Sequence, residues 1–284
     1  MGTKKRLFLF AAFDSKNIHN GIIDDTLIIY IRELSEIGDV VFFQDNEAAE
    51  SELKKIAPFV LFANAARHGE YDFGSYKRGY LWARDNSLLD NYDWVYLVND
   101  SVYAPLYPLR PVIETLESKN TDVTGMVFTD RKKNPHIQSW FIGTSKKVFM
   151  SGYFYSFITS VAKPNNKSDI YKYEDGFTEL CKQNNLRSAA AYYVRNREIY
   201  NNIKGLFRKD LPFMKKKAFR RRHGALGRQT LYVLNNISPE LKAAIVKHAQ
   251  YLYGEDYVNK FLTNSILKIF YRKISYAVYR LLKG

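Results

Sequence analysis

Apolar and polar residues form alternating blocks along the first 130 residues of the chain. Short apolar runs bounded by charged residues predict β-strands, and longer amphipathic runs predict α-helices. The predicted strands are residues 6–14, 39–44, 59–65, 93–100 and 122–130, and the predicted helices are residues 24–38, 46–57, 75–86 and 109–120. Strands and helices therefore alternate, which is typical of an α/β fold with a largely parallel sheet covered by helices.

The pattern is looser after Thr129, where a polar loop comes first. Ser238 and Pro239 have the residue types expected at the N-cap and first position of a helix. The remaining predicted elements are a strand ending near Gly143, helical segments within residues 146–161, 166–186 and 238–262, and an amphipathic C-terminal helix over residues 264–284.

Polar residues follow three of the predicted strands: Asp14, Asn64 and the triplet Asn99-Asp100-Ser101. In a parallel sheet, ligands bind beyond the carboxyl ends of the strands, so we expect these residues to meet at one edge. The triplet has two interpretations. It forms an ordinary turn, because Asn, Asp and Ser bond readily to local backbone, or Asp100 holds a charged ligand.

The excess of positive charge lies in one part of the chain. Residues 1–200 carry 25 Lys or Arg and 25 Asp or Glu, whereas residues 201–284 carry 18 basic and four acidic residues, which accounts for the whole net charge of +14. Such a basic segment predicts an anionic partner, either nucleic acid or a membrane surface. We therefore expect a folded domain over residues 1–200 and a basic, mainly helical appendage over residues 201–284.

Residue spacing excludes several common kinds of site. No two glycines have G-x-G spacing, and neither a P-loop nor a G-x-S-x-G turn is present. The five histidines lack zinc-ligand spacing. Cys181 is the only cysteine, which excludes an intramolecular disulfide and fits a reducing compartment. No run reaches the roughly 18 apolar residues expected of a membrane-spanning helix.

One polar stretch, residues 64–79, suits a pyrophosphate and a sugar. Its glycines allow close approach of the backbone to a ligand, and its cations and one acid provide charged groups. These residues are Gly69, Gly74, Gly79, Arg67, Lys77, Arg78 and Asp72. The alternative interpretation is a glycine-rich loop before a helix with ordinary surface charges.

Four blocks resemble the rhamnan synthesis protein F family in order and spacing: RHGEYDFGSYKRG, DWVYLVNDSVYAPLYPL, HIQSWFIG and KYEDGFTEL. The resemblance covers roughly residues 6–193 and leaves the basic appendage largely outside. In one departure, Arg67-His68-Gly69 stands where residues of Asn-x-Gly type are expected. The resemblance implies a GT-A-like, single Rossmann-type domain that binds a nucleotide sugar.

The resemblance also implies a glycosyltransferase that moves rhamnose or another hexose from a nucleoside-diphosphate donor to a growing, lipid-linked cell-surface polysaccharide such as O-antigen, capsule or rhamnan. A divalent metal, Mg²⁺ or Mn²⁺, would be held by Asp100 and Ser101, because such ions take one or two carboxylates and complete their shell with water and phosphate. Alternatively, Asp100 bonds only to a sugar hydroxyl. The expected donor-binding residues are Asp14, Asn64, Arg67, Gly69, Asp72, Tyr76, Arg78 and Asn99.

Glu174 and Asp175 stand where inverting enzymes of this type carry a catalytic carboxylate. A carboxylate within reach of the attacking hydroxyl can act as general base, and the resemblance centres on Glu174. The alternative is helix capping, because acids in a first turn interact favourably with the helix dipole. Gln138, Ser139 and Trp140 are expected to line the acceptor side, where Trp140 either stacks on a sugar ring or belongs to the core.

The basic appendage is expected to attach to anionic headgroups, where each Lys or Arg near the surface contributes about 1 kcal/mol. This places the protein in the cytoplasm, peripherally on the inner face of the bacterial membrane. The alternative is a helical subdomain that packs its aromatic face internally. Two rival functions are a non-catalytic scaffold of polysaccharide assembly and a nucleic-acid-binding protein that uses the cations and phenylalanines of residues 213–222. We expect no nucleic-acid partner, because no nucleic-acid module is present.

Overall fold

The computed structural model describes residues 4–130, 135–166, 169, 172–195, 197–219, 225–263, 265, 267, 270, 271, 274 and 278. The chain divides into two compact units. The first comprises residues 1–23, 30–100 and 108–194, and the second comprises residues 24–29, 101–107 and 195–284. The second unit therefore takes two short segments from the first half of the chain besides the basic C-terminal part. The expected boundary after residue 200 stays a prediction.

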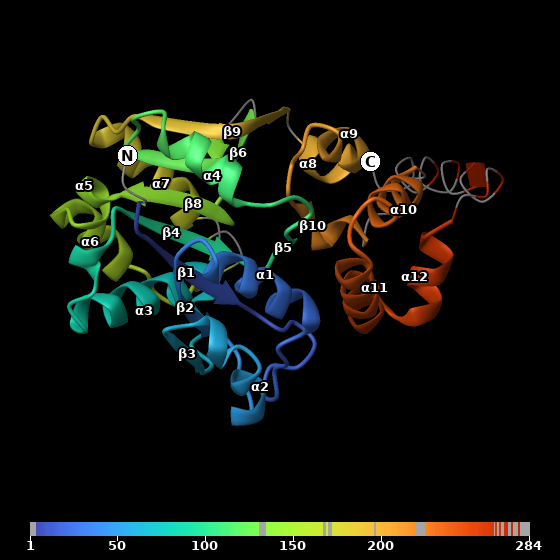
Figure 1. The fold of residues 1–284 in the computed structure, drawn as a ribbon, viewed down its shortest axis with the longest axis horizontal. Helices are drawn as coiled ribbons and strands as arrows, with labels where there is room; N and C mark the ends of the chain where they lie inside the picture. The colour runs from blue at the N-terminus through green and yellow to red at the C-terminus, as the bar shows by residue number, and fades with distance from the viewer. Residues whose placement is uncertain are drawn as a thin grey trace. The chain divides into compact units, whose positions relative to one another are not determined.

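Eight strands of the described residues form one sheet in the order β3-β2-β1-β4-β8-β6-β7, with β9 paired to β6 (Figure 1). Strands β3, β2, β1 and β4 are parallel, whereas β8 is antiparallel to β4 and β6, and β7 to β6. The predicted parallel sheet is thus present in the first half, and later strands add antiparallel pairs. Bounds are β1 Arg6–Ala12, β2 Asp39–Gln44, β3 Phe62–Ala65, β4 Trp94–Asn99, β6 Val123–Asp130, β7 His136–Ile137, β8 Phe141–Ser145 and β9 Ser188–Arg195.

Helices cover both faces of the sheet, because successive strand side chains point to opposite faces. On one face, Leu7 and Leu9 of β1 pack with Tyr76 of α3 and with buried residues of α5, α6 and α7. On the other face, the ring of Phe10 contacts that of Tyr30 of α1, with centroids 5.2 Å apart. Bounds are α1 Asp25–Ser35, α2 Glu50–Lys54, α3 Tyr71–Asp85, α4 Arg110–Glu117, α5 Lys146–Phe149, α6 Gly152–Thr159 and α7 Lys172–Gln183, with 3₁₀ helices at Ala57–Phe59 (η1) and Leu89–Asn91 (η2).

Some predicted boundaries are wrong for local reasons. Residues 146–161 form two helices, because the Ser151 side chain caps the second by accepting a hydrogen bond from the Phe154 N–H. The helix predicted from residue 75 already begins at Tyr71, whose φ of 58° lies in the left-handed region. The strand predicted over residues 59–65 is shortened to β3, because the residues before it include η1.

The second unit has its own apolar core and a two-stranded antiparallel sheet of β5 and β10. The N-cap prediction for Ser238 is confirmed, because its hydroxyl accepts the Leu241 N–H at 3.3 Å. Residues 238–262 form two helices, separated by Gly254 with φ of +91°. Bounds are β5 Val102–Tyr103, β10 Met214–Lys215, α8 Glu198–Asn201, α9 Ile203–Phe207, α10 Leu226–Leu234, α11 Pro239–Tyr253, α12 Glu255–Phe261 and 3₁₀ helix η4 Lys216–Ala218.

Much of the basic and aromatic stretch around η4 lies inside the second unit. Phe213 and Phe219 are buried, and so are Lys215 and Lys216. Internal packing, the alternative interpretation, therefore describes these four residues. Arg220-Arg221-Arg222 lie outside the described residues. Within the part of the chain that the structure describes, no helix has the length and apolar character needed to cross a membrane.

A buried ion pair joins the sheet of the first unit to α4. The Arg6 guanidinium on β1 donates from Nε and Nη2 to the two oxygens of Glu117, each at 2.8 Å. The Tyr96 hydroxyl of β4 donates to the same carboxylate at 2.7 Å. Both charged side chains are at most 2% exposed. The pair therefore ties α4 to two central strands through groups that water does not reach.

Replacing Glu117 by Gln is expected to destabilise the protein by about 3–5 kcal/mol, because it leaves the Arg6 guanidinium buried without a counter-charge. The exposed pair of Lys54 and Glu50 on α2 provides a matched control, and Glu50→Gln should change stability by less than about 0.5 kcal/mol. Urea denaturation followed by circular dichroism measures both. Equal effects of the two substitutions would contradict the structural role of the buried pair.

Candidate functional site

Four parallel strands end at the same edge of the sheet in the first unit. The register aligns Ala12 of β1 with Gln44 of β2, and Gln44 with Ala65 of β3, while Ala11 aligns with Asn99 of β4. The expectation that the polar strand ends meet at one edge is therefore confirmed for the residues of this unit. They are Asp14 after β1, Asn64 within β3, and Asn99 and Asp100 at the end of β4.

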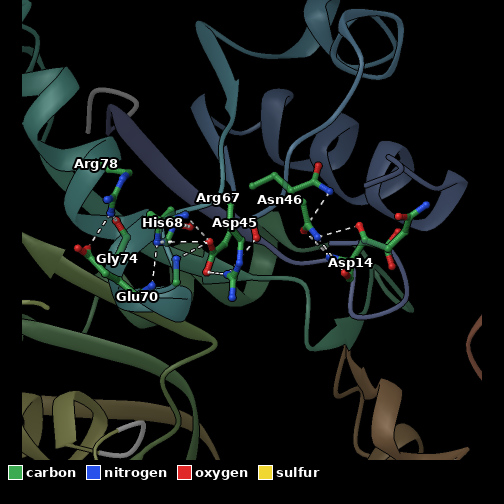
Figure 2. A network of polar contacts seen from close by, with 12 residues as sticks. Asp14, Asp45, Asn46, Arg67, His68, Glu70, Gly74 and Arg78 are labelled. Carbon is green, nitrogen blue, oxygen red and sulfur yellow. Dashed lines mark hydrogen bonds and ion pairs between the residues drawn. The ribbon is translucent and has the colours of Figure 1, made fainter. Parts of the chain in front are cut away.

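Asp45, directly after β2, organises the loop between β3 and α3 (Figure 2). Its Oδ1 accepts the backbone N–H groups of His68 and Gly69, each at 2.8 Å, and its Oδ2 lies 2.6 Å from Nη1 of Arg67. Burial raises the pKa of Asp45, but these hydrogen bonds outweigh it and hold the pKa below its usual value. Gly69 has a φ of +72°, which the turn requires and which favours glycine.

Glu70 forms ion pairs at the start of α3 (Figure 2). Its Oε2 lies 2.6 Å from Nζ of Lys77 and 2.7 Å from Nη1 of Arg78, which also donates to the Gly74 carbonyl at 2.9 Å. A Cβ at Gly74 would collide with the Glu70 side chain and lie 2.9 Å from the His68 ring. Arg67 and Arg78, both expected at the donor, therefore also hold the loop together.

Asp14 has a comparable role in the loop after β1. Its carboxylate accepts the backbone N–H groups of Lys16 at 2.9 Å and Ile22 at 3.3 Å. Its backbone N–H and carbonyl bond to the side chain of Asn46, at 2.7 and 2.9 Å (Figure 2). Asp14 thus joins the ends of β1 and β2 and rigidifies the edge beside which a ligand would lie.

Asp72, Tyr76 and Asn99 form the centre of this edge. Asn99 is buried and donates from Nδ2 to Oδ2 of Asp72 at 2.8 Å. Burial first, then the Asp72 carboxylate, raises the pKa of the Tyr76 hydroxyl well above its usual value, and the Asp100 carboxylate adds to the shift. The Tyr76 hydroxyl therefore stays neutral, and both carboxylates act on it electrostatically. The Tyr76 hydroxyl donates a hydrogen bond to the Ser139 carbonyl at 3.2 Å.

Glu174 reaches this edge from the first turn of α7. Its Oε1 accepts the Ser139 backbone N–H at 3.3 Å and the Ser139 hydroxyl at 3.1 Å, and it lies 3.5 Å from Nε2 of His136. The side chain of Glu174 is 24% exposed, whereas that of His136 is 5% exposed. Glu174 is thus held through one oxygen, while Oε2 receives no hydrogen bond from the described residues. Asp175 is exposed in the same turn.

Gln138 and Trp140, two of the three expected acceptor residues, are buried. The Trp140 indole N–H donates to Oε1 of Gln138 at 2.6 Å, and Gln138 donates to the hydroxyl of Thr129 at 2.6 Å. Trp140 is only 2% exposed, so the interpretation of Trp140 as a core residue fits its surroundings. These two side chains flank Ser139 in sequence and bond to each other.

Two acidic groups at this edge have the chemistry to hold a divalent cation. Asp72 and Asp100 supply two carboxylates, both of which raise the pKa of the Tyr76 hydroxyl, and Mg²⁺ or Mn²⁺ binds one or two carboxylates together with substrate phosphates. No group of three or more His, Cys, Asp or Glu side chains with metal-binding geometry occurs among the residues that the structure describes. Ser101, the other expected metal ligand, belongs to the second unit, where its hydroxyl accepts a hydrogen bond from Lys215 at 2.9 Å.

Three residues of the edge were not anticipated from the sequence: Asp45, Asn46 and His136. Asp45 and Asn46 follow a strand directly, which is the same signal that identified Asp14. His136 lies in the block HIQSWFIG, but its approach to Glu174 depends on the pairing of β7 with β6, which brings two distant segments together.

Acid is expected to destabilise the loop through His68. Burial lowers the pKa of His68 to about 4, and the nearby Asp45 carboxylate does not offset this. The neutral ring accepts the Glu70 N–H at Nδ1, 3.0 Å away, and its Nε2 lies 3.0 Å from the Ser75 hydroxyl. Because the unfolded state has the higher pKa, near 6.5, it binds more protons between pH 6.5 and 4.

The free energy of unfolding should therefore fall by up to about 3 kcal/mol as the pH drops from about 6.5 to 4, since each pKa unit is worth about 1.4 kcal/mol. Urea titrations at several pH values measure this slope. His68→Asn, whose amide oxygen can still accept the Glu70 N–H, should flatten it. The same slope in both proteins would show that His68 is not the titrating group.

Comparisons with known proteins agree with the sequence blocks. The model of the family described as rhamnan synthesis protein F matches residues 40–276. An uncharacterised protein, y4gN of Sinorhizobium fredii, is 21% identical over 155 residues, which is 54% of this chain and 40% of that protein. The chain thus spans about two fifths of the length of this curated relative.

Two solved structures are also similar. A protein described as a nucleotide-diphospho-sugar transferase, from Desulfovibrio desulfuricans, has a TM-score of 0.41 and 17% identity, covering 81% of this chain and 96% of that one. Core-mannan synthase A from Aspergillus fumigatus, in a Mn/GDP form, has a TM-score of 0.33 and 12% identity, covering 60% and 66%.

Proposed function

Because this chain belongs to the rhamnan synthesis protein F family, we propose that it is a glycosyltransferase. It transfers a sugar, rhamnose or another hexose, from a nucleoside-diphosphate donor to a growing cell-surface polysaccharide. The observation that best supports this proposal is the connected set of polar groups at the carboxyl edge of the first unit. Asp72 and Asn99 bond to each other, and Tyr76 and Glu174 both bond to Ser139.

The donor diphosphate is proposed to lie at the ends of β1 and β4. Asp100 and Asp72 would hold the divalent cation, which when bound neutralises charge on the departing diphosphate. The Asp45 loop keeps the neighbouring backbone rigid, so that little ordering is needed when the donor binds. The predicted roles of Asn64 as a donor contact and of Ser101 as a metal ligand stay proposals.

Glu174 is proposed as the general base, acting through Oε2. Ser139 and His136 approach Oε1 only, which orients the carboxylate and leaves the second oxygen for the acceptor. The acceptor hydroxyl gives its proton to Oε2 while its oxygen attacks the anomeric carbon. The bond from that carbon to the diphosphate oxygen breaks, and the electron pair leaves with the diphosphate. Attack from the opposite side inverts the configuration at this carbon.

The acceptor is proposed to be lipid-linked, with the protein held peripherally on the inner face of the cytoplasmic membrane. The C-terminal residues support this proposal, because exposed apolar side chains recur at helical spacing along a basic segment. They are Leu267, Phe270, Tyr271, Ile274 and Val278, with exposed fractions from 48% to 81%. Anionic headgroups would bind the cations of the same segment.

Donor binding tests the proposal directly. Calorimetry with a panel of nucleoside diphosphates and nucleotide sugars, with and without Mn²⁺, should find one nucleotide that binds in a metal-dependent way. Asp100→Ala should weaken this binding about 30-fold or more, because loss of a charged ligand costs roughly 2 kcal/mol. Asp85→Ala, an exposed acid at the last residue of α3, should change nothing. No binding of any nucleotide to the folded protein would favour a scaffold role.

Turnover tests the role of Glu174. Glu174→Gln should lower the rate of donor cleavage, measured as nucleoside diphosphate released with water as acceptor, by about 10²–10⁴-fold, because the base is lost. Nucleotide affinity should be unchanged. Asp175→Asn, in the same helical turn, is the matched control and should retain most activity. Equal losses from both substitutions would point to helix capping rather than to catalysis.

A further inference from the structure

A pocket of about 400 Å³ in the first unit lies away from the candidate site. It is bordered by the end of α3, by η2 and by the junction of α5 and α6. Trp94 pairs with Ser145, so the start of β4 and the end of β8 lie at the same sheet edge. The pocket residues Asp90 and Met150 flank these two ends in sequence. The pocket is therefore at the edge opposite Asn99, about 20 Å away along the six residues of β4.

The inner wall of the pocket is buried, and its outer rim is exposed to solvent. Tyr80 is 3% exposed, and its hydroxyl donates to the Phe149 carbonyl at 2.8 Å. At the rim, the Arg84 guanidinium lies over the Tyr155 ring, 4.0 Å from the centroid. Tyr155 and Met150 are 37% and 45% exposed. The stacked pair thus presents a flat surface, and the guanidinium carries hydrogen-bond donors in its plane.

We propose that this pocket binds a neutral sugar unit. A pyranose needs a flat apolar surface for its C–H face and polar partners for its hydroxyls. Tyr155 and Met150 provide the surface, and Arg84 provides donors. Asp90 provides the acceptor Oδ2, while its Oδ1 lies 3.6 Å from Nζ of Lys146. The lining contains one cation and one carboxylate, so a phosphate or nucleic acid would gain little from it.

The inference rests on the proposed function, because the polysaccharide under construction is the sugar chain that the protein meets. A site about 20 Å from the reaction edge binds a segment of that chain remote from its growing end. Such binding raises the effective concentration of the acceptor terminus, as a tether does. The pocket is therefore a holding site for the polymer, separate from donor chemistry.

The test uses Gly152, which lines the pocket and at which a Cβ meets no atom within 4 Å. Gly152→Trp should fill the pocket without disturbing the protein around it. Ser156→Trp, at an exposed position in the same helix outside the pocket lining, is the matched control. The probes are maltotriose and a rhamnose trisaccharide, titrated to tens of millimolar into the full ¹⁵N-labelled chain. Amide shifts locate the binding site.

We expect shifts at Ser87, Ser151 and Gly152 in the wild type, at least tenfold weaker binding in Gly152→Trp, and unchanged binding in Ser156→Trp. The inference is overturned if neither trisaccharide binds, or if the shifts lie elsewhere or persist in Gly152→Trp. Nucleotide binding measured on the same samples separates this inference from the proposed function. Saccharide binding at the pocket without nucleotide binding would support the holding site and contradict the proposed transferase activity.

Discussion

The parallel alignment of β3, β2, β1 and β4 is the constraint on which the rest of the site depends. Because these strands run in one direction, their carboxyl ends and the loops that follow lie together. A register slip of one residue would turn every inward side chain to the other face. The aromatic and aliphatic residues packed on both faces therefore determine where Asp14, Asp45 and Asp100 emerge from the sheet.

Rigid polar loops at this edge are built from groups that would be costly to bury unpaired. Asp45 satisfies two backbone N–H groups and one guanidinium, and Glu70 satisfies two further cations. Tyr71, with a φ of 58°, begins α3 in a conformation that is strained for a tyrosine. It immediately precedes Asp72, so the strain is stored beside the carboxylate that we place at the donor.

Elements that depend on residues close together in the sequence were predicted correctly. The central strands and the cap at Ser238 follow from apolar runs and from one hydroxyl, and the structure confirms them. The family resemblance, carried by four linked blocks, is confirmed by the family match, but its expected extent is wrong, because the match covers residues 40–276 and so includes most of the basic appendage. Asp14 and Asp100 were identified because polar residues beyond the carboxyl ends of parallel strands lie where ligands bind. The same reasoning applied to β2 would have identified Asp45.

Features that depend on distant contacts could not be predicted. The antiparallel β8 and β7, which bring Ser139 and His136 to the edge, depend on pairing that no local pattern reveals. The composition of residues 213–219 suggested a surface for anions, yet Lys215 and Lys216 are buried, and Lys215 donates a hydrogen bond to the Ser101 hydroxyl. Charge counts describe composition, whereas burial depends on partners far away in the sequence.

A crystal structure of a nucleotide complex would show whether Asp100 holds the metal. Crystals grown with Mn²⁺ and the nucleoside diphosphate that binds would locate the ion by its anomalous scattering. We expect one Mn²⁺ bonded to the Asp100 carboxylate, with the diphosphate beyond the ends of β1 and β4 and Glu174 on the side from which the acceptor approaches. Nucleotide and metal bound at another edge of the sheet, away from Asp100, would contradict it.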